Sequence, residues 1–261
     1  MSERGRVAGK VAIVTGAAKG LGQAAAELLV REGATVICTD VDEIACRRVV
    51  DALGDRAVFF AQDVTEESGW REVIDMAMER YGGLHILVNN AGIVSLGDAE
   101  STTYDQYRAI MAVSMDGVFF GCKYAIPAMN RSGGGSIINM SSIAALVGES
   151  VVAAYCAAKG AVRSYTKAVA VHCTRQGYHI RCNSIHPSGM DTPMVRDFAA
   201  SAAALAPATP ADHKPVIVSR LGEPSDVAHA VLFLASDESK FMSGAELVID
   251  NTITVTAGVV P

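Results

Sequence analysis

The chain has 261 residues, half of them apolar, so it is long enough to bury a core and fits one α/β domain. Its formal charge is −6 and its basic residues are scattered, which argues against nucleic acid and anionic membrane surfaces as partners. The longest stretch without a charged residue, Ser132 to Gly148, is interrupted by glycine, serine and asparagine, so no membrane span is expected.

The six cysteines lie in apolar stretches and include no C-x-x-C pair. This pattern is typical of buried thiols in a reducing compartment rather than of disulfides or a zinc site. The first ten residues contain no apolar segment of the kind that a signal peptide needs. We therefore expect a cytoplasmic protein without a metal.

Short β-branched runs alternate with longer runs of helical spacing along the chain. Strands are expected at Lys10–Thr15, Thr35–Asp40, Ala57–Ala61, Ile86–Val88, Ser136–Met140, Ile180–Ser184 and Glu246–Ile249. Helices are expected at Leu21–Arg31, Asp42–Leu53, Glu67–Tyr81 and, approximately, Tyr104–Asn130 and Val152–Gly177. The alternation predicts a single α/β domain over residues 1–261, with a doubly wound parallel sheet and helices on both faces.

The two last-named helices are apolar around most of their circumference. Such helices bury more than one face, so we expect a homotetramer or homodimer; a thick cap over the core is the alternative. Farther along, Phe198–Ala211 is rich in alanine and proline, which indicates a short helix on a mobile loop.

A glycine-rich turn, TGAAKGLG from Thr15 to Gly22, joins the first strand to the first helix. Glycine permits positive φ and close approach of the backbone, and a helix N-terminus offers free N–H groups to a pyrophosphate. The spacing is G-x-x-x-G-x-G rather than G-x-G-x-x-G. The turn predicts a dinucleotide site with contacts at Gly16, Lys19, Gly20 and Leu21.

Polar residues follow the next three strands, at the sheet edge where open α/β sheets bind ligands. Asp40 can accept hydrogen bonds from the adenosine ribose and repels a 2′-phosphate, so NAD is the expected cofactor. Lys19 is a contrary signal, because a basic residue in this turn can pair with that phosphate. Asp63 with Val64 is expected at the adenine and Asn90 with Gly92 at the adjoining ribose, although loop capping explains both pairs nearly as well.

Tyr155 and Lys159 stand four residues apart at the start of a helical run, so they share one helix face. A phenol with a pKa of ~10 becomes a useful base near neutrality only with ~4 kcal/mol of extra stabilisation of its anion. A lysine ammonium and an oxidised nicotinamide ring can supply that order of energy. Ser142, which closes the fifth strand, can hydrogen-bond the substrate oxygen as charge develops there.

These motifs together resemble the classical short-chain dehydrogenase/reductase family over nearly the whole chain, from Val7 to Asp250. The resemblance implies a seven-stranded Rossmann fold, dimers or tetramers, and hydride transfer between nicotinamide C4 and a carbinol or carbonyl carbon. It further implies that Tyr155 is the general acid/base, that Ser142 holds the substrate oxygen, and that Lys159 binds the nicotinamide ribose and lowers the Tyr155 pKa. The segment that would grip the carboxamide contains Pro187, Met190 and Thr192.

The sequence departs from the family pattern at two places. Ser114 stands where the family usually has an asparagine that holds a water beside the lysine, which puts the proton relay in question. Ser188 stands where glycine often follows Pro187, and its side chain is expected to narrow the substrate mouth or bind a polar substrate group. His186, just before Pro187, is expected to be structural rather than a proton carrier.

The segment at about residues 190–215 is expected to form the substrate lid, and its apolar side chains indicate an apolar substrate. Packing of the same side chains against a neighbouring subunit is the alternative explanation. The apolar members of the lid are Met190, Met194, Val195, Phe198 and Leu205, with Ile143, Leu146 and Val147 expected on the opposite wall. Within the family, Arg181–Met194 and Leu232–Asn251 most resemble bacterial 3β/17β-hydroxysteroid dehydrogenases. The leading hypothesis is thus an NAD-dependent dehydrogenase of an apolar secondary alcohol or ketone, possibly a hydroxysteroid. The alternatives are a cis-dihydrodiol or cycloalkanol dehydrogenase and a nicotinamide-sensing binding protein.

Overall fold

The computed structural model describes residues 5–205 and 221–255, which form an α/β domain around a seven-stranded sheet with every strand parallel to its neighbours. The sheet has the order β3-β2-β1-β4-β5-β6-β7, which confirms the predicted Rossmann-type fold. The strands are β1 (Val11–Thr15), β2 (Thr35–Asp40), β3 (Ala57–Ala61), β4 (Ile86–Asn89), β5 (Gly135–Met140), β6 (Ile180–Pro187) and β7 (Glu246–Ile249). From β1 the chain adds strands toward one edge of the sheet, up to β3, and from β4 onward it adds them toward the other edge. Between β1 and β4 this switch leaves a crevice at the carboxyl ends of the strands.

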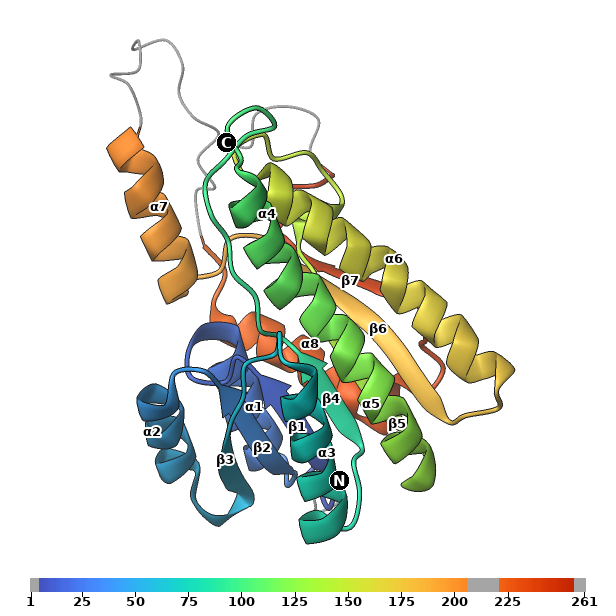
Figure 1. Cartoon of the computed structure of the whole chain (residues 1–261). Helices are drawn as coiled ribbons and strands as arrows, with labels where there is room; N and C mark the ends of the chain where they lie inside the picture. The colour runs from blue at the N-terminus through green and yellow to red at the C-terminus, as the bar shows by residue number, and fades with distance from the viewer. Residues whose placement is uncertain (1–4, 206–220, 256–261) are drawn as a thin grey trace.

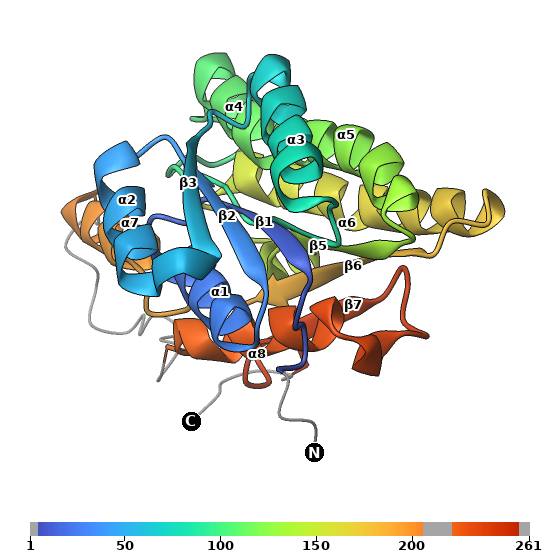
Figure 2. The ribbon, with the colours of Figure 1, turned by 90° about the horizontal axis from the view of Figure 1, so that it is seen from below.

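Helices cover both faces of the sheet (Figures 1 and 2). On one face lie α1 (Gly20–Arg31), α2 (Glu43–Leu53) and α8 (Pro224–Ala235); on the other lie α3 (Glu67–Tyr81), α4 (Tyr104–Met111), α5 (Gly117–Arg131) and α6 (Ala153–Arg175). The remaining helix, α7 (Pro193–Leu205), stands beside the carboxyl edge of the sheet (Figure 1).

Strand β1 shows why a continuous apolar run becomes a central strand of the sheet. All five of its residues are buried, and successive side chains point to opposite faces. Ala12 and Val14 pack with α1 and α8, whereas Val11 and Ile13 pack with α3 and α5. A strand covered on both sides has no polar face, so its sequence reads as a continuous apolar run.

The expected helices differ from the structure in three places. The run expected at about Tyr104–Asn130 is divided by a π-helical turn at Ala112–Asp116. Helix α7 begins before the expected Phe198, because Pro193 fits the first helical position and Thr192 accepts a hydrogen bond from the N–H of Val195. Residues 206–211 of that expectation lie outside the described residues. Helix α8 was not expected at all.

The helical stretch Tyr104–Arg131 is long and apolar enough, by length and composition alone, to cross a membrane. It packs on β4, β5 and α6 as a core helix does, and charged residues such as Asp116 and Lys123 interrupt it.

Candidate active site

A cavity of about 450 Å³ opens at the carboxyl edge of the sheet. Residues from the β1–α1 turn, the ends of β2, β3, β4 and β5, the first turns of α6, and the β6–α7 segment line it. Apart from Ser114, every catalytic and cofactor-binding residue that the sequence pointed to is part of this lining, and so is Ser188. The fold therefore gathers residues from seven separate segments around one space.

The glycine-rich turn forms one end of the cavity. Gly16 and Gly20 have φ values of 65° and 60°, and a Cβ on Gly22 would lie 2.1 Å from the carbonyl oxygen of Gly16. Lys19, at the N-cap of α1, makes no side-chain capping hydrogen bond. The first turn of α1 therefore presents backbone N–H groups to the cavity with no side chain in front of them, which fits a pyrophosphate.

Asn90 holds this turn in place. Its amide nitrogen donates to the carbonyl oxygens of Thr15, at 2.9 Å, and Gly16, at 3.2 Å. The backbone N–H of Asn90 in turn donates to the Thr15 hydroxyl at 3.0 Å. Asn90 thus shapes the turn through its nitrogen and leaves only its side-chain oxygen for the ribose contact that the sequence suggested.

Asp40 ends β2 with its carboxylate fixed against the backbone. Oδ2 accepts from the N–H of Ala18 at 3.0 Å, and Oδ1 accepts from the N–H of Asp42 at 2.9 Å. These bonds leave further lone pairs of both oxygens facing the cavity. The exposed Lys19 lines the same cavity without an ion pair to any described residue.

The two residues expected at the adenine, Asp63 and Val64, differ in exposure and in their contacts. Asp63 is exposed, and its Oδ1 accepts from both the N–H and the hydroxyl of Thr65, so loop capping occupies it. Val64 is buried beneath the cavity, against Gly117. Sequence reasoning missed Gln62, which is 4% exposed and lines the cavity, and whose amide has no hydrogen-bond partner among the described residues. A polar residue directly after an apolar strand was the available signal.

Ser142 follows β5, and the neighbouring strand sets its position. Its hydroxyl oxygen accepts from the N–H of Ala144 at 3.1 Å. His186 on β6 lies 3.1 Å from the Ser142 carbonyl oxygen through Nδ1 and 2.9 Å from the Ser184 hydroxyl through Nε2. Burial lowers the pKa of His186, so the ring is neutral, with Nδ1–H donating to Ser142 and Nε2 accepting from Ser184. This arrangement makes His186 a support for Ser142.

Tyr155 and Lys159 lie on successive turns of α6, facing the cavity. The Lys159 ammonium is buried, donates to the carbonyl oxygen of Met140 at 2.8 Å, and lies 5.5 Å from the centre of the Tyr155 ring. Burial lowers the pKa of Lys159 to about 8. Burial also raises the pKa of Tyr155 to about 12, against the lowering effect of a hydrogen bond with Ser142.

The expected lowering of the Tyr155 pKa by Lys159 and an oxidised nicotinamide stays a prediction, because in the protein alone Lys159 is not among the groups that shift this pKa. The reason is geometric, because the Met140 carbonyl holds the ammonium over the ring rather than at the phenol oxygen. Desolvation then dominates and favours the neutral form of the phenol.

Ser114 lies in the π-helical turn, fully buried, and its hydroxyl has no hydrogen-bond partner in the part of the chain that the structure describes. A Cβ built on Gly92 would lie 3.5 Å from the Ser114 Oγ and 3.3 Å from the Lys159 Nζ. The two polar atoms therefore border the same small space beside Gly92. A buried hydroxyl without a partner is costly, and a water between it and the ammonium would satisfy both groups.

The β6–α7 segment closes the opposite side of the cavity. Pro187 ends β6, the N–H of Ser188 donates to the Ile249 carbonyl, and Thr192 packs beside Gly20 of the cofactor turn. Met190, Met194 and Val195 line the cavity as expected from the lid.

The rest of the expected apolar lining is not found there. Ile143, Leu146 and Val147 do not line the cavity, because a short 3-10 turn at Ile143–Ala145 carries the chain away after Ser142. Phe198, on α7, does not line it either. Ile93 and Val113, from the β4–α4 side, take the place of that wall. The Leu205 side chain and residues 206–215 of the lid lie outside the described residues.

Comparison with known proteins agrees with this geometry. A family model described as Enoyl-(Acyl carrier protein) reductase matches residues 16–254. The chain is 42% identical over 253 residues to a 3-beta-hydroxysteroid dehydrogenase from Comamonas testosteroni, covering 95% of this chain and 97% of the relative. It is 41% identical over 254 residues to an NADP-dependent (R)-specific alcohol dehydrogenase from Lentilactobacillus kefiri, covering 95% and 98%.

A third relative, 40% identical over 253 residues, is a 2,5-dichloro-2,5-cyclohexadiene-1,4-diol dehydrogenase from Sphingobium indicum, with coverage of 94% and 96%. The family match, over residues 16–254, includes most of the cofactor turn together with Ser142, Tyr155 and Lys159. The chain therefore belongs to the short-chain dehydrogenase/reductase family, and it is an oxidoreductase of alcohols and ketones that uses a nicotinamide cofactor.

Proposed function

We propose that the protein transfers a hydride between NAD and the carbinol or carbonyl carbon of an apolar secondary alcohol or ketone, with hydroxysteroids as the leading substrate class. The observation that carries the proposal is the convergence of Ser142, Tyr155 and Lys159 on a cavity that has Asp40 at its far end. One space thus holds the groups for proton transfer together with a seat for a dinucleotide.

The preference for NAD rests on Asp40. Its two oxygens are fixed by backbone N–H groups, so the carboxylate cannot turn away from a 2′-phosphate without losing both hydrogen bonds. Lys19 acts in the opposite direction, but its exposed ammonium is screened by solvent and salt.

The bound nicotinamide would accept or give the hydride, and the chain supplies the proton chemistry. In ketone reduction, the neutral Tyr155 phenol donates its proton to the substrate oxygen, and the Ser142 hydroxyl holds that oxygen in place. In alcohol oxidation, the Tyr155 oxygen accepts the proton, which requires its pKa to fall from about 12 toward neutrality. That fall of about five units corresponds to ~7 kcal/mol. Positive charge near the ring, from Lys159 and the oxidised cofactor, is the source of this energy.

The substrate class is inferred from the lining. Ile93, Val113, Met190, Met194 and Val195 give the substrate end apolar walls, and Ser188 adds one hydroxyl group. The hydroxysteroid dehydrogenase from Comamonas testosteroni supports a steroid. The cyclohexadiene-diol dehydrogenase from Sphingobium indicum supports the alternative, a cis-dihydrodiol or cycloalkanol.

The test is a substrate panel followed by NADH absorbance. Hydroxysteroids, cycloalkanols and cis-dihydrodiols are offered with NAD⁺ to the wild type and to Tyr155→Phe. We expect turnover of at least one hydroxysteroid, and a loss of ~10²–10⁴-fold in the variant. Turnover of ring diols alone would replace the steroid assignment. If the wild type and the variant are equally inactive in single-turnover experiments while NAD⁺ still binds, the protein is a nicotinamide-sensing binding protein.

We also propose a homotetramer or homodimer. The outer face of α5 and α6 exposes Phe119 and Val171, with 40% and 51% of their surface accessible. Together with the apolar circumference of these two helices, these exposed side chains support a subunit contact on this face. Light scattering at several protein concentrations measures the mass, and a monomer throughout contradicts the assembly.

A further inference from the structure

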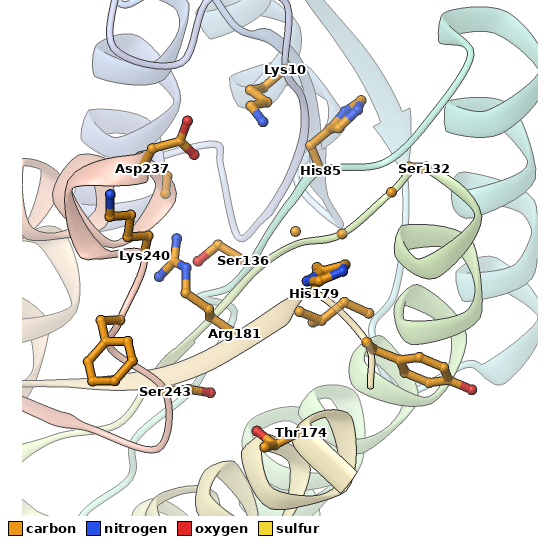
Figure 3. Close-up of a pocket in the computed structure, with 17 residues that line it drawn as sticks. Lys10, His85, Ser132, Ser136, Thr174, His179, Arg181, Asp237, Lys240 and Ser243 are labelled. Carbon is orange, nitrogen blue, oxygen red and sulfur yellow. The ribbon is translucent and has the colours of Figure 1, made fainter. Parts of the chain in front are cut away.

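A second cavity, of about 530 Å³, lies at the amino edge of the sheet, opposite the candidate active site. Figure 3 shows residues that line it: Lys10 precedes β1, His85 precedes β4, and Arg181 belongs to β6. Asp237 and Lys240 come from the segment that follows α8. None of these residues takes part in the hydride-transfer site.

The lining is basic although the chain is acidic. Lys10, Arg181 and Lys240 face one carboxylate, that of Asp237, whereas the whole chain has a net charge of −6. No ion pair within the described residues involves Lys10, Lys240 or Arg181. Lys123 and Lys167, by contrast, are paired with Glu67 and Glu246. The cavity therefore holds about two uncompensated positive charges.

Basic residues at helix C-termini often serve only to neutralise the helix dipole. Here Arg181 fills that role for α8, because its Nη2 donates to the carbonyl oxygens of Leu234 and Ser236. The last carbonyls of α5 are satisfied by backbone N–H groups of residues 132–134. The ammonium groups of Lys10 and Lys240 make no hydrogen bond to any described residue. Capping of helices thus does not account for the two lysines.

Two further groups offer donors. The Nη1 of Arg181 is buried and finds no hydrogen-bond partner within residues 5–205 and 221–255, so the guanidinium retains N–H groups that these residues do not use. His85 accepts the N–H of Val11 through Nδ1 at 3.1 Å, which puts the proton of a neutral ring on Nε2. Burial and the nearby Lys10 lower the pKa of His85, so the ring stays neutral and adds no charge.

We propose that this second cavity is a binding site for a compact phosphate-class anion that carries at least two negative charges, such as inorganic pyrophosphate. A dianion balances the charge of three cations and one carboxylate, and it accepts hydrogen bonds from the ammonium and imidazole donors around it. The site is separate from the dinucleotide seat, because the whole length of the sheet lies between the two edges.

The test is a calorimetric titration with inorganic pyrophosphate at constant ionic strength. The protein is first saturated with NAD⁺, so that the pyrophosphate seat at α1 is filled. Lys10→Gln/Lys240→Gln removes the two unpaired cations, and Lys123→Gln/Lys167→Gln removes the same charge from paired lysines elsewhere. We expect the first double variant to bind pyrophosphate at least tenfold more weakly than the wild type, and the second to bind within twofold of it.

The proposal is overturned if the wild type shows no saturable heat up to about 10 mM pyrophosphate, which corresponds to a binding free energy weaker than about 3 kcal/mol. It is equally overturned if both double variants lose affinity to the same extent, or if succinate binds as tightly as pyrophosphate. Melting temperatures of the variants show whether they fold, which is expected because Lys240 is exposed and Lys10 half-buried. If NAD⁺ fails to bind, the two double variants still distinguish binding at the second cavity from binding at the α1 turn, because both variants retain that turn.

Discussion

Cofactor choice is the property that one carboxylate controls most directly. Asp40→Asn keeps the shape of the side chain but removes its charge, and its single carbonyl oxygen can retain only one of the bonds to Ala18 and Asp42. At ~5 Å and an effective dielectric constant of ~20, two unit charges repel by about 3 kcal/mol. Solvent and salt reduce this for a half-exposed group, so we take about 1.5 kcal/mol for repulsion of a 2′-phosphate.

NAD itself loses a charged acceptor for its ribose hydroxyls, which is worth about 1.5 kcal/mol more. The two effects add in the ratio of kcat/KM for NAD⁺ over that for NADP⁺, which should fall by ~3 kcal/mol, or about 100-fold. Loosening of the glycine-rich turn affects both cofactors equally and cancels in this ratio. Lys19→Gln is the matched control, and it should raise the ratio because it removes the cation that attracts the phosphate.

The assay is initial-rate kinetics with one alcohol and both cofactors for wild type, Asp40→Asn and Lys19→Gln. A ratio that changes by less than twofold in Asp40→Asn would refute the assignment of Asp40 to the ribose. A wild type that already prefers NADP⁺ would show that Lys19 outweighs Asp40.

Three further predictions concern the buried polar groups. Ser114→Asn should change turnover by less than about tenfold, ~1.4 kcal/mol, because an amide can also hold a water beside Lys159; steady-state kcat measures this, and a larger loss shows a specific need for serine. Lys159→Met should abolish most activity yet stabilise the fold at pH 7 by up to about 3 kcal/mol, since burial disfavours the ammonium fully below pH 8. This gain in unfolding free energy should shrink as the pH rises from 8 to 10.5, because at the upper end the lysine of the unfolded chain also loses its proton. Denaturant unfolding of the wild type and the variant at pH 7 and 9.5 measures the gain, and an equal gain at both pH values contradicts the prediction. Alcohol oxidation should have a more alkaline pH optimum than ketone reduction, because the Tyr155 phenol must lose its proton for one and keep it for the other; coincident pH profiles exclude this role.

The fold was predictable because both faces of the sheet are buried. A strand such as Ile86–Asn89 has no solvent face, so it reads as an apolar run between turn residues, and the five inner strands of the sheet are mostly buried in the same way, whereas the edge strands β3 and β7 are half-buried. Helix α8 was missed although its sequence holds a usable signal. Pro224 occupies the first helical position, and Glu223 and Asp226 form a reciprocal cap with the backbone.

The site was predictable in its members but not in its energetics. The positions of Ser142, Tyr155 and Lys159 follow from strand ends and helical spacing, which are local properties. The atom that fixes the Lys159 ammonium is a backbone carbonyl of Met140, 19 residues away on another element. The neutral state of His186 and the isolated hydroxyl of Ser114 likewise depend on packing between distant segments. No spacing in the sequence carries that information.

Burial pushes the two titrating groups of the site toward their neutral forms, the phenol upward to a pKa of about 12 and the ammonium downward to about 8. At pH 7 the tyrosine is therefore a protonated acid and most of the lysine is still charged, with its charge directed at the Met140 carbonyl and the ring face. This state suits proton donation to a ketone without any rearrangement. Proton acceptance from an alcohol requires additional positive charge beside Tyr155, and an oxidised nicotinamide is cationic whereas a reduced one is not. The charge of the cofactor thus favours the protonation state of Tyr155 that each direction of the reaction needs, and the apolar surroundings that oppose ionisation are what make the phenol responsive to that charge.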